Sequence, residues 1–353
     1  MSLKSIIILI AVLIPWTHTW GKIKPTFHFT NKNATMPVVV RGNVSSKVLI
    51  VFLHGGPGGT AMTKIGTRAF ASLEEDYGIV YWDQRGANGS SGGTQKKWMN
   101  LSQYVEDLDV LVDQLKNRYH GSNIYLMGHC WGGGFGTAYL IDNTRQAKIV
   151  GWIDVAGAHN NPKGDSLSVV WVNEYAKRMI AIRKDVRYWK RALQWYRNNP
   201  AFTSDKLGHY SYVRKSQGYQ LVQGDSLGQF PWFTQKDLLF RPATYVSYYV
   251  NYYRTLSSFL ISDIDLTREM HNIKVPSLII WGEDDGLIPL TMAYEAYNSL
   301  GTDPTEKYLV TLPRTAHTVF YEQPVLFRAA VKSFINPSKN ATDQPSAWNS
   351  VSF

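Results

Sequence analysis

Cysteine is almost absent from this chain of 353 residues, which contains only one, Cys130. A single thiol excludes an internal disulfide, so the fold must be held together by its core alone. With 44% hydrophobic and 13% aromatic residues, the chain is long enough to bury a full core, either in one large domain with an insertion or in two domains. The one cysteine therefore needs an explanation other than cross-linking.

Long apolar runs are also absent. Ile6–Ile14 has nine apolar residues, too few to span a bilayer. It follows Lys4 and precedes Pro15 and a short stretch that ends at Gly21, which is typical of a cleaved secretory signal. We therefore predict a signal peptide over residues 1–21, a secreted or secretory-lumen protein, and no stable membrane anchor. Five sequons, which would be glycosylated only in a eukaryotic secretory route, support this; they begin at Asn33, Asn43, Asn88, Asn100 and Asn340.

Acidic residues are fewer than basic ones, and the net charge is +10. Such a charge is compatible with a nucleic-acid or membrane-surface partner. Taken over the whole chain, however, Lys and Arg are scattered and interleaved with acids, which indicates a solvated basic surface. No nucleic-acid-binding motif and no internal repeat is visible, so we predict no nucleic-acid partner.

Apolar runs of strand length alternate with segments of helical periodicity, a pattern typical of a mostly parallel sheet covered by helices. Apolar residues from Tyr104 to Tyr119 fall at helical spacing and mark one such helix. The sequence thus predicts an α/β fold with a mostly parallel central sheet. The candidate strands are Val48–Leu53, Ile79–Trp82, Ile124–Met127, Ile149–Val155, Ser277–Trp281 and Lys307–Leu312.

Residues 159–272 break this alternation. The segment has few β runs, several amphipathic helical stretches, and 20 of the 47 aromatic residues of the chain. We predict a helical cap inserted into a core formed by residues 22–158 and 273–336, with a flexible tail over 337–353. The aromatic residues of the cap could line a substrate pocket, but for any one of them a place in the cap's own small core is the commoner fate.

Cys130 lies in Gly-His-Cys-Trp-Gly, residues 128–132, directly after the candidate strand Ile124–Met127. This is the nucleophile-elbow pattern G-x-S-x-G with sulfur in place of oxygen, in which the glycines leave room for a sharp turn. A helix beginning at Trp131 would point its N-terminal amides at the sulfur and favour the thiolate. A free cysteine is more often a small buried hydrophobe, but the elbow context favours a nucleophile.

A cysteine nucleophile needs a base and a group that orients the base. Asp285 follows the candidate strand Ser277–Trp281, and His317 follows Lys307–Leu312, in the order nucleophile, acid, histidine expected of this architecture. His317 would accept the thiol proton, and Asp285 would fix the imidazole tautomer. Asp284 is a rival for the acid, since spacing cannot rank adjacent carboxylates. Both aspartates could instead be turn formers, and His317 an ordinary histidine.

A glycine-rich loop supplies the remaining requirement of such a site. His54-Gly-Gly-Pro-Gly-Gly59 directly follows the strand Val48–Leu53, in the manner of loops that donate one backbone N–H to an oxyanion hole. The second N–H comes from the residue after the nucleophile. We assign these donors to Gly56 and Trp131. Alone, the loop could equally be a glycine-proline turn without a catalytic role.

These motifs resemble the prolyl aminopeptidase (proline iminopeptidase) family of α/β-hydrolases. The resemblance rests on residues 54–59, on Tyr81-Trp-Asp-Gln-Arg-Gly86, on Gly128-His-Cys-Trp-Gly-Gly133, and on His317 through Glu322-Gln-Pro324. It implies an α/β-hydrolase fold and an enzyme that removes an N-terminal residue, often proline, through an acyl-enzyme intermediate. It also implies that the enzyme uses no metal and no cofactor. Asp83 and Arg85 of the second motif are expected to brace a loop.

Two departures from the family bear on the substrate. Cysteine stands where the family has serine, and the family's cap holds the substrate amine with acidic residues, whereas this cap has 16 Lys or Arg against 9 Asp or Glu. This excess fits an anionic substrate group better than an ammonium. Glu174 is a candidate amine anchor, although a structural charge on a helix surface is the commoner role for such a residue.

Three hypotheses follow from the sequence. The first is a secreted hydrolase that cleaves a small peptide, amide or ester through Cys130, His317 and Asp285. The second is an acyltransferase or thioesterase on the same scaffold, because a thioester passes its acyl group readily to amines and thiols. The third is a binding protein without catalysis. The partner in each case is a small molecule or short peptide, and the sequence leaves the oligomeric state open.

Overall fold

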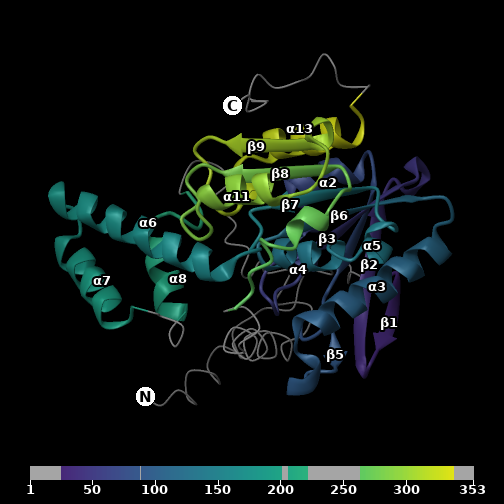
Figure 1. Ribbon diagram of the computed structural model, residues 1–353, viewed down its shortest axis with the longest axis horizontal. Helices are drawn as coiled ribbons and strands as arrows, with labels where there is room; N and C mark the ends of the chain where they lie inside the picture. The colour runs from purple at the N-terminus through teal and green to yellow at the C-terminus, as the bar shows by residue number, and fades with distance from the viewer. Residues whose placement is uncertain (1–24, 88, 201–205, 222–262, 338–353) are drawn as a thin grey trace, which may run out of the picture.

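The computed structural model describes residues 25–87, 89–200, 206–221 and 263–337 (Figure 1). The predicted signal peptide, residues 201–205 and 222–262 of the predicted cap, and all but the first residue of the predicted tail lie outside the described residues. In the part that is described, nine strands form one sheet, in the order β1-β2-β4-β3-β6-β7-β8-β9, with β5 paired to β2. The α/β fold with a mostly parallel central sheet is confirmed.

The six strands predicted from the sequence are all present, and neighbouring members of this set are parallel. Parallel strands present their carboxyl ends at the same edge of a sheet. The loops that carry the glycine-rich segment, the elbow, the aspartates and the histidine therefore meet at that edge. The strands are β3 (Val48–Leu53), β4 (Gly78–Trp82), β6 (Asn123–His129), β7 (Gly151–Val155), β8 (Ser277–Gly282) and β9 (Lys307–Leu312).

Three further strands were not predicted. β1 (Phe27–Asn31) and β2 (Ala34–Gly42) form an antiparallel hairpin, and β2 continues the sheet next to β4. The short β5 (Ser91–Gly92) pairs with the start of β2. Pro37 lies within β2, and a proline lowers the expectation of a strand because it cannot donate a ladder hydrogen bond.

Helices cover both faces of the sheet (Figure 1). The two faces are distinguished along β3, where Leu49 and Val51 join one apolar cluster while Ile50 and Phe52 join the other, as the alternation of side chains in a strand requires. The first cluster includes α3 (Leu101–Arg118), α4 (Trp131–Leu140) and α11 (Thr291–Ser299), and the second includes α2 (Arg68–Glu74), α12 (Val319–Glu322) and α13 (Pro324–Ile335).

Three α-helices lie in the described part of the chain between β7 and β8. They are α6 (Asn161–Ala181), α7 (Val186–Asn198) and α8 (Lys206–Lys215), which extend away from the sheet at the left of Figure 1. Trp189 and Tyr196 are buried in the core of this helical unit. Among the described residues, no helix is both long and apolar enough to cross a membrane.

A buried ion pair ties the loop after β4 to α3. Arg85 donates from Nε and Nη2 to the two carboxylate oxygens of Asp107, both at 2.7 Å, and neither side chain is exposed. The same guanidinium donates to the carbonyls of Gly93 and Asn31. Asp83 accepts hydrogen bonds from the N–H groups of Ala61 and Gly89. Both residues of the second motif therefore brace loops.

Removing one member of this pair should destabilise the protein strongly. Arg85→Met leaves the Asp107 carboxylate buried without its cation, which should lower the free energy of unfolding by about 3–5 kcal/mol. The double variant Arg85→Met/Asp107→Leu should recover part of that loss. Urea unfolding measures the free energy of unfolding of the single and the double variant. The control is Lys32→Met, because the exposed Lys32–Glu106 pair should contribute less than about 1 kcal/mol. Equal losses for Arg85→Met and Lys32→Met would contradict the prediction.

Candidate active site

Cys130 forms a strained turn between β6 and α4. Its φ of 57° and ψ of −121° are rare for a residue with a side chain and are found where surrounding structure imposes them. A Cβ on Gly128 would collide with the carbonyl of Gly132, and one on Gly132 would collide with the carbonyl of Leu53. The turn therefore requires glycine on both sides, as the elbow pattern predicts, and the Cys130 side chain is left partly exposed.

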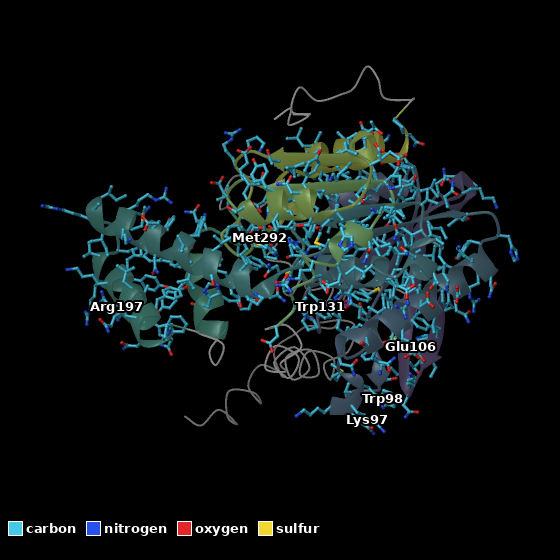
Figure 2. All side chains as sticks on the ribbon, viewed as in Figure 1. Lys97, Trp98, Glu106, Trp131, Arg197 and Met292 are labelled. Carbon is cyan, nitrogen blue, oxygen red and sulfur yellow. The ribbon has the colours of Figure 1, made fainter. Side chains whose placement is uncertain are left out.

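Hydrogen bonds fix the backbone of this turn. The Cys130 N–H donates to the carbonyl of Val155 at 3.1 Å, and the Cys130 carbonyl accepts from the N–H of Ala158 at 2.9 Å. The carbonyl also accepts from Gly133 in the first turn of α4. Figure 2 labels the next residue, Trp131, near the middle of the molecule.

The glycine-rich loop lies directly against the nucleophile elbow. A Cβ on Gly55 would stand 3.3 Å from the Cβ of Cys130, and the next residue, Gly56, has a φ of +139° that favours glycine. Within the described part of the chain, the main-chain N–H groups of Gly56 and Trp131 donate no hydrogen bond. Two free N–H donors on either side of a nucleophile are what an oxyanion hole needs.

Gln84 joins the glycine-rich loop to the elbow. Its main-chain N–H donates to Nε2 of His54 at 3.1 Å, and its side-chain amide donates to the His54 carbonyl at 3.1 Å. Its side-chain oxygen accepts from the indole N–H of Trp131 at 2.9 Å. Because all three side chains are buried, Gln84 fixes the spacing between the two candidate donor segments. The sequence placed Gln84 in a motif but gave it no role.

His54 is held in its neutral form. Burial lowers its pKa to about 4, although a hydrogen bond to the Gly55 carbonyl acts in the opposite direction. Nδ1 lies 2.8 Å from that carbonyl and carries the proton, which leaves Nε2 free to accept from Gln84. A protonated His54 could not accept this hydrogen bond.

Asp285 and His317 form a buried pair. Nδ1 of His317 donates to Oδ2 of Asp285 at 2.8 Å, and Oδ1 of Asp285 accepts from the N–H groups of Leu287 and Ile288. Asp284 is half-exposed, and burial together with Glu283 raises its pKa. The structure therefore places Asp285, and not Asp284, against the histidine, since only Asp285 is turned inward by main-chain donors.

The other ring nitrogen of His317 faces Cys130. Nε2 is buried and makes no hydrogen bond to the described residues, but the ring is close enough to the sulfur to be affected by its charge. Burial lowers the pKa of His317, whereas attraction to Asp285 and to Cys130 raises it more strongly, to about 10. The protonated form of the imidazole is therefore favoured beside the sulfur.

His129 links the elbow to the histidine loop. Its Nε2 donates to the main-chain carbonyl of His317 at 3.0 Å, and the two ring centroids are 4.7 Å apart. Burial, and then the proximity of His317, holds the pKa of His129 well below its usual range. A neutral His129 one residue before the nucleophile therefore positions the main chain of His317. Its location inside the elbow motif was the only signal in the sequence.

Glu322 holds the histidine loop from the other side. Its Oε2 accepts from the N–H of Ala316 at 3.1 Å, and its Oε1 accepts from the N–H of Thr318 at 3.2 Å and from the Thr318 hydroxyl. Both neighbours of His317 are thus bound to one carboxylate. Oε2 also accepts from the N–H of Leu221 in the cap at 2.9 Å, so the same group connects the cap to the histidine loop.

The cap contacts the site at two more points. The ring of Tyr219 lies 5.6 Å from the ring of His317. Trp171 on α6 packs against Gly286, where a Cβ would stand 2.5 Å from its indole ring, and the Gly286 N–H donates to the Gly218 carbonyl at 2.8 Å. Aromatic residues of the cap therefore lie both in its own core and beside His317 and Gly286.

Glu174 lies apart from this group. It is exposed on α6 and pairs with Lys177 at 2.6 Å, which favours the alternative of a charge on a helix surface. No cluster of three His, Cys, Asp or Glu side chains that could hold a metal ion occurs among the described residues.

We expect Glu322→Gln to disturb the positioning of His317. An amide offers one acceptor oxygen instead of two, so main-chain donors of the loop lose their partner, at a cost of about 1–3 kcal/mol in unfolding free energy. Alkylation of Cys130 by iodoacetamide at pH 7 should slow, and its pH profile should change. The control is Glu283→Gln, an exposed side chain that bonds Thr311. An unchanged alkylation profile in Glu322→Gln would refute a positioning role.

His54 should make the protein sensitive to acid. An unfolded histidine takes up a proton near pH 6.5, whereas folded His54 does so only near 4. The unfolding free energy should therefore fall as the pH drops from 6.5 to 4, by about 3 kcal/mol from this residue. Urea unfolding at several pH values should show a smaller loss in His54→Gln, which keeps an acceptor without titrating. Equal losses of unfolding free energy in the unmodified protein and in His54→Gln would argue against a contribution of His54 to the acid sensitivity.

Comparisons with known proteins agree with this geometry. A family model described as "alpha/beta hydrolase fold" matches residues 48–324. The chain is 23% identical over 314 residues to "Probable aminopeptidase YbaC" of Bacillus subtilis (strain 168), covering 84% of this chain and 91% of that protein. It is 22% identical over 342 residues to "Epoxide hydrolase 4" of Homo sapiens, covering 93% and 81%.

A solved structure gives the same fold. The crystal structure of a proline iminopeptidase from Mycobacterium smegmatis superposes with a TM-score of 0.62 at 16% identity, covering 90% of this chain and 99% of that one. Because the family match spans most of the chain and includes the elbow, the aspartates and the histidine, this protein belongs to the α/β-hydrolase fold family.

Proposed function

We propose that this protein cleaves a small peptide, amide or ester through an acyl-cysteine intermediate on Cys130. The observation that carries the proposal is the state of His317: Nδ1 is held by Asp285 at 2.8 Å, while Nε2 has no hydrogen bond among the described residues and faces the sulfur side. A histidine oriented at one nitrogen and free at the other is arranged to move a proton.

In the first half of the reaction, the Cys130 thiolate attacks the substrate carbonyl. The carbon–sulfur bond forms, and the negative charge that develops on the carbonyl oxygen is stabilised by the N–H groups of Gly56 and Trp131. The imidazolium of His317 then gives its proton to the departing amine or alcohol, and the bond to that leaving group breaks. Asp285 stabilises the imidazolium throughout and keeps its orientation.

In the second half, water resolves the thioester. Neutral His317 takes a proton from the water as it attacks, and collapse of the second tetrahedral intermediate releases the carboxylic acid product and restores the Cys130 thiolate beside an imidazolium. The proton taken from water therefore remains on Nε2 of His317 and is given to the leaving group of the next turnover.

The choice of substrate rests on the relatives. Those with an aminopeptidase or iminopeptidase name favour a peptide or amide with a free N-terminus, and the epoxide hydrolase relatives indicate that the scaffold accommodates other small molecules. The exposed Glu174 gives no support to amine binding, so esters and amides without a free amine belong in the same test. Secretion remains part of the proposal through the predicted signal peptide.

The sulfur nucleophile favours a second candidate function, acyl transfer. A thioester reacts readily with amines and thiols as well as with water. An acyltransferase or thioesterase would use the same Cys130, His317 and Asp285 and would differ only in the acceptor that enters under the cap.

The two functions are separated by one panel of substrates. The protein is incubated with prolyl and other aminoacyl amides, simple esters and acyl thioesters, with and without an amine acceptor, and intact mass reports an acyl group on Cys130. Hydrolysis without an acceptor supports the first function, and turnover that needs the acceptor supports the second. No acyl adduct and no turnover would contradict both and leave a binding protein.

Variants locate the chemistry within the panel. Cys130→Ala should abolish turnover, and His317→Gln should reduce it by about a thousandfold or more, because proton transfer and nucleophile activation are lost together. The control is Lys332→Gln on α13, which removes an ion pair with Asp76. Full activity in Cys130→Ala would eliminate the proposed mechanism.

The pair of Cys130 thiolate and His317 imidazolium that this mechanism requires predicts fast alkylation. Because the pKa of His317 is raised to about 10, its positive charge is present beside the sulfur throughout the range from pH 6.5 to 9, where it stabilises a thiolate. Alkylation of Cys130 by iodoacetamide over this range should therefore be faster in the unmodified protein than in His317→Gln. Equal rates in the two proteins would count against the pair.

A further inference from the structure

The positive charge of this protein is concentrated on one arm. Residues 177–197, from the last turn of α6 to the end of α7, contain eight Lys or Arg and one Asp, a net charge of +7 in a chain whose total is +10. The rest of the predicted cap is electrically balanced, with eight basic and eight acidic residues. This concentration departs from the even interleaving inferred from the whole chain. We call residues 177–197 the basic arm.

Every cation of the basic arm is exposed. Along α7, the side chains of Trp189, Ala192 and Tyr196 are buried, so the helix directs its apolar side to the rest of the cap and its charged side to solvent. The exposed cations are Lys177, Arg178, Arg183, Lys184, Arg187, Lys190, Arg191 and Arg197.

Little negative charge offsets the arm. Its one acid, Asp185, lies 3.5 Å from Lys215 of α8, which adds a ninth cation next to the arm. Among the described residues, Lys177 is the one cation of the arm that forms an ion pair, with Glu174. The other cations of the arm form no ion pair with a described residue, so they present an excess of positive charge at the surface of the described part of the chain.

An apolar side chain stands among these charges. Ile182, in the turn between α6 and α7, is 64% exposed, the highest exposure of any large hydrophobic residue described. It is followed by Arg183 and Lys184. The arm projects away from the sheet at the left of Figure 1, and Figure 2 labels Arg197 at that end of the molecule, remote from Lys97.

We propose that the basic arm attaches this protein reversibly to anionic phospholipid membranes. Lys and Arg near an anionic bilayer contribute about 1 kcal/mol each, and an exposed isoleucine at the tip can enter the apolar boundary of the headgroups. The apolar side of α7 is already packed within the cap, so attachment is shallow and electrostatic. A nucleic acid is the less suitable partner for base stacking, since Trp189 and Tyr196 are buried and the half-buried rings of Tyr188 and Trp195 already pack against Tyr212.

The proposal is tested by sedimentation of the full chain with vesicles. At 100 mM salt, the protein should bind vesicles of phosphatidylcholine with 30% phosphatidylserine and should bind vesicles of pure phosphatidylcholine much more weakly. The pure phosphatidylcholine vesicles also measure any binding through the apolar segment Ile6–Ile14, which does not depend on lipid charge. The triple variant Arg187→Glu/Lys190→Glu/Arg191→Glu should bind the anionic vesicles about a hundredfold less tightly or worse. Raising the salt concentration to 500 mM should release the unmodified protein.

A matched variant separates the arm from overall charge. Lys96→Glu/Lys97→Glu/Lys116→Glu makes the same change in charge at exposed positions outside the arm and should retain binding. Ile182→Ser should weaken binding less than the triple variant does. Equal loss in the two triple variants, equal binding to both kinds of vesicle, or binding to DNA or polyglutamate but not to anionic vesicles would each overturn the proposal. Hydrolysis of a water-soluble ester by the triple variant shows that its fold is intact.

Discussion

The backbone of Cys130 is the constraint on which the site depends. A positive φ at a residue with a side chain costs of order 1–3 kcal/mol, and the surrounding contacts impose it: the main chains at Gly128 and Gly132 approach too closely for a β-carbon, and Val155 and Ala158 hold the Cys130 amide and carbonyl. The strained turn presents the sulfur beside the end of the sheet, and no described residue accepts a hydrogen bond from the Trp131 N–H. If the turn relaxed, the sulfur, the Trp131 N–H and the glycine-rich loop would no longer converge on the position proposed for the substrate carbonyl.

Three side chains hold the loops in place around that turn by hydrogen bonds from one loop to another. Gln84 joins the glycine-rich loop to Trp131, His129 joins the elbow to the main chain of His317, and Glu322 joins both neighbours of His317 to the cap. Each of these side chains is within or next to a motif that the sequence displays. The site is therefore assembled from loops that support one another, and the sheet fixes only where those loops begin.

Much of this arrangement could be predicted because it depends on order along the chain. Parallel strands place the loops after β6, β8 and β9 at one edge, so Cys130, the aspartates and His317 were expected to meet. The choice between Asp284 and Asp285 could not be made, since it depends on which carboxylate the N–H groups of Leu287 and Ile288 turn inward.

Other features could not be predicted from the sequence, each for a different physical reason. The strand β2 was missed because Pro37 interrupts a run that otherwise has strand character. The roles of Gln84, His129 and Glu322 are contacts between loops distant in sequence, which composition does not encode. The sequence contains the basic arm as a local excess of Lys and Arg, but the charge was considered over the whole chain. Only the structure shows that these cations are exposed together, which indicates a binding surface.

The presence of one cysteine in the chain has a consequence for oxidation. If the partly exposed sulfur at the elbow is oxidised to a sulfenic acid, the chain has no second cysteine with which that acid can condense. Recovery must therefore use a thiol from another molecule, and without one the oxidation proceeds to the sulfinic and sulfonic acids. The single cysteine thus makes reversal of the oxidation depend on whether such a thiol reaches the elbow.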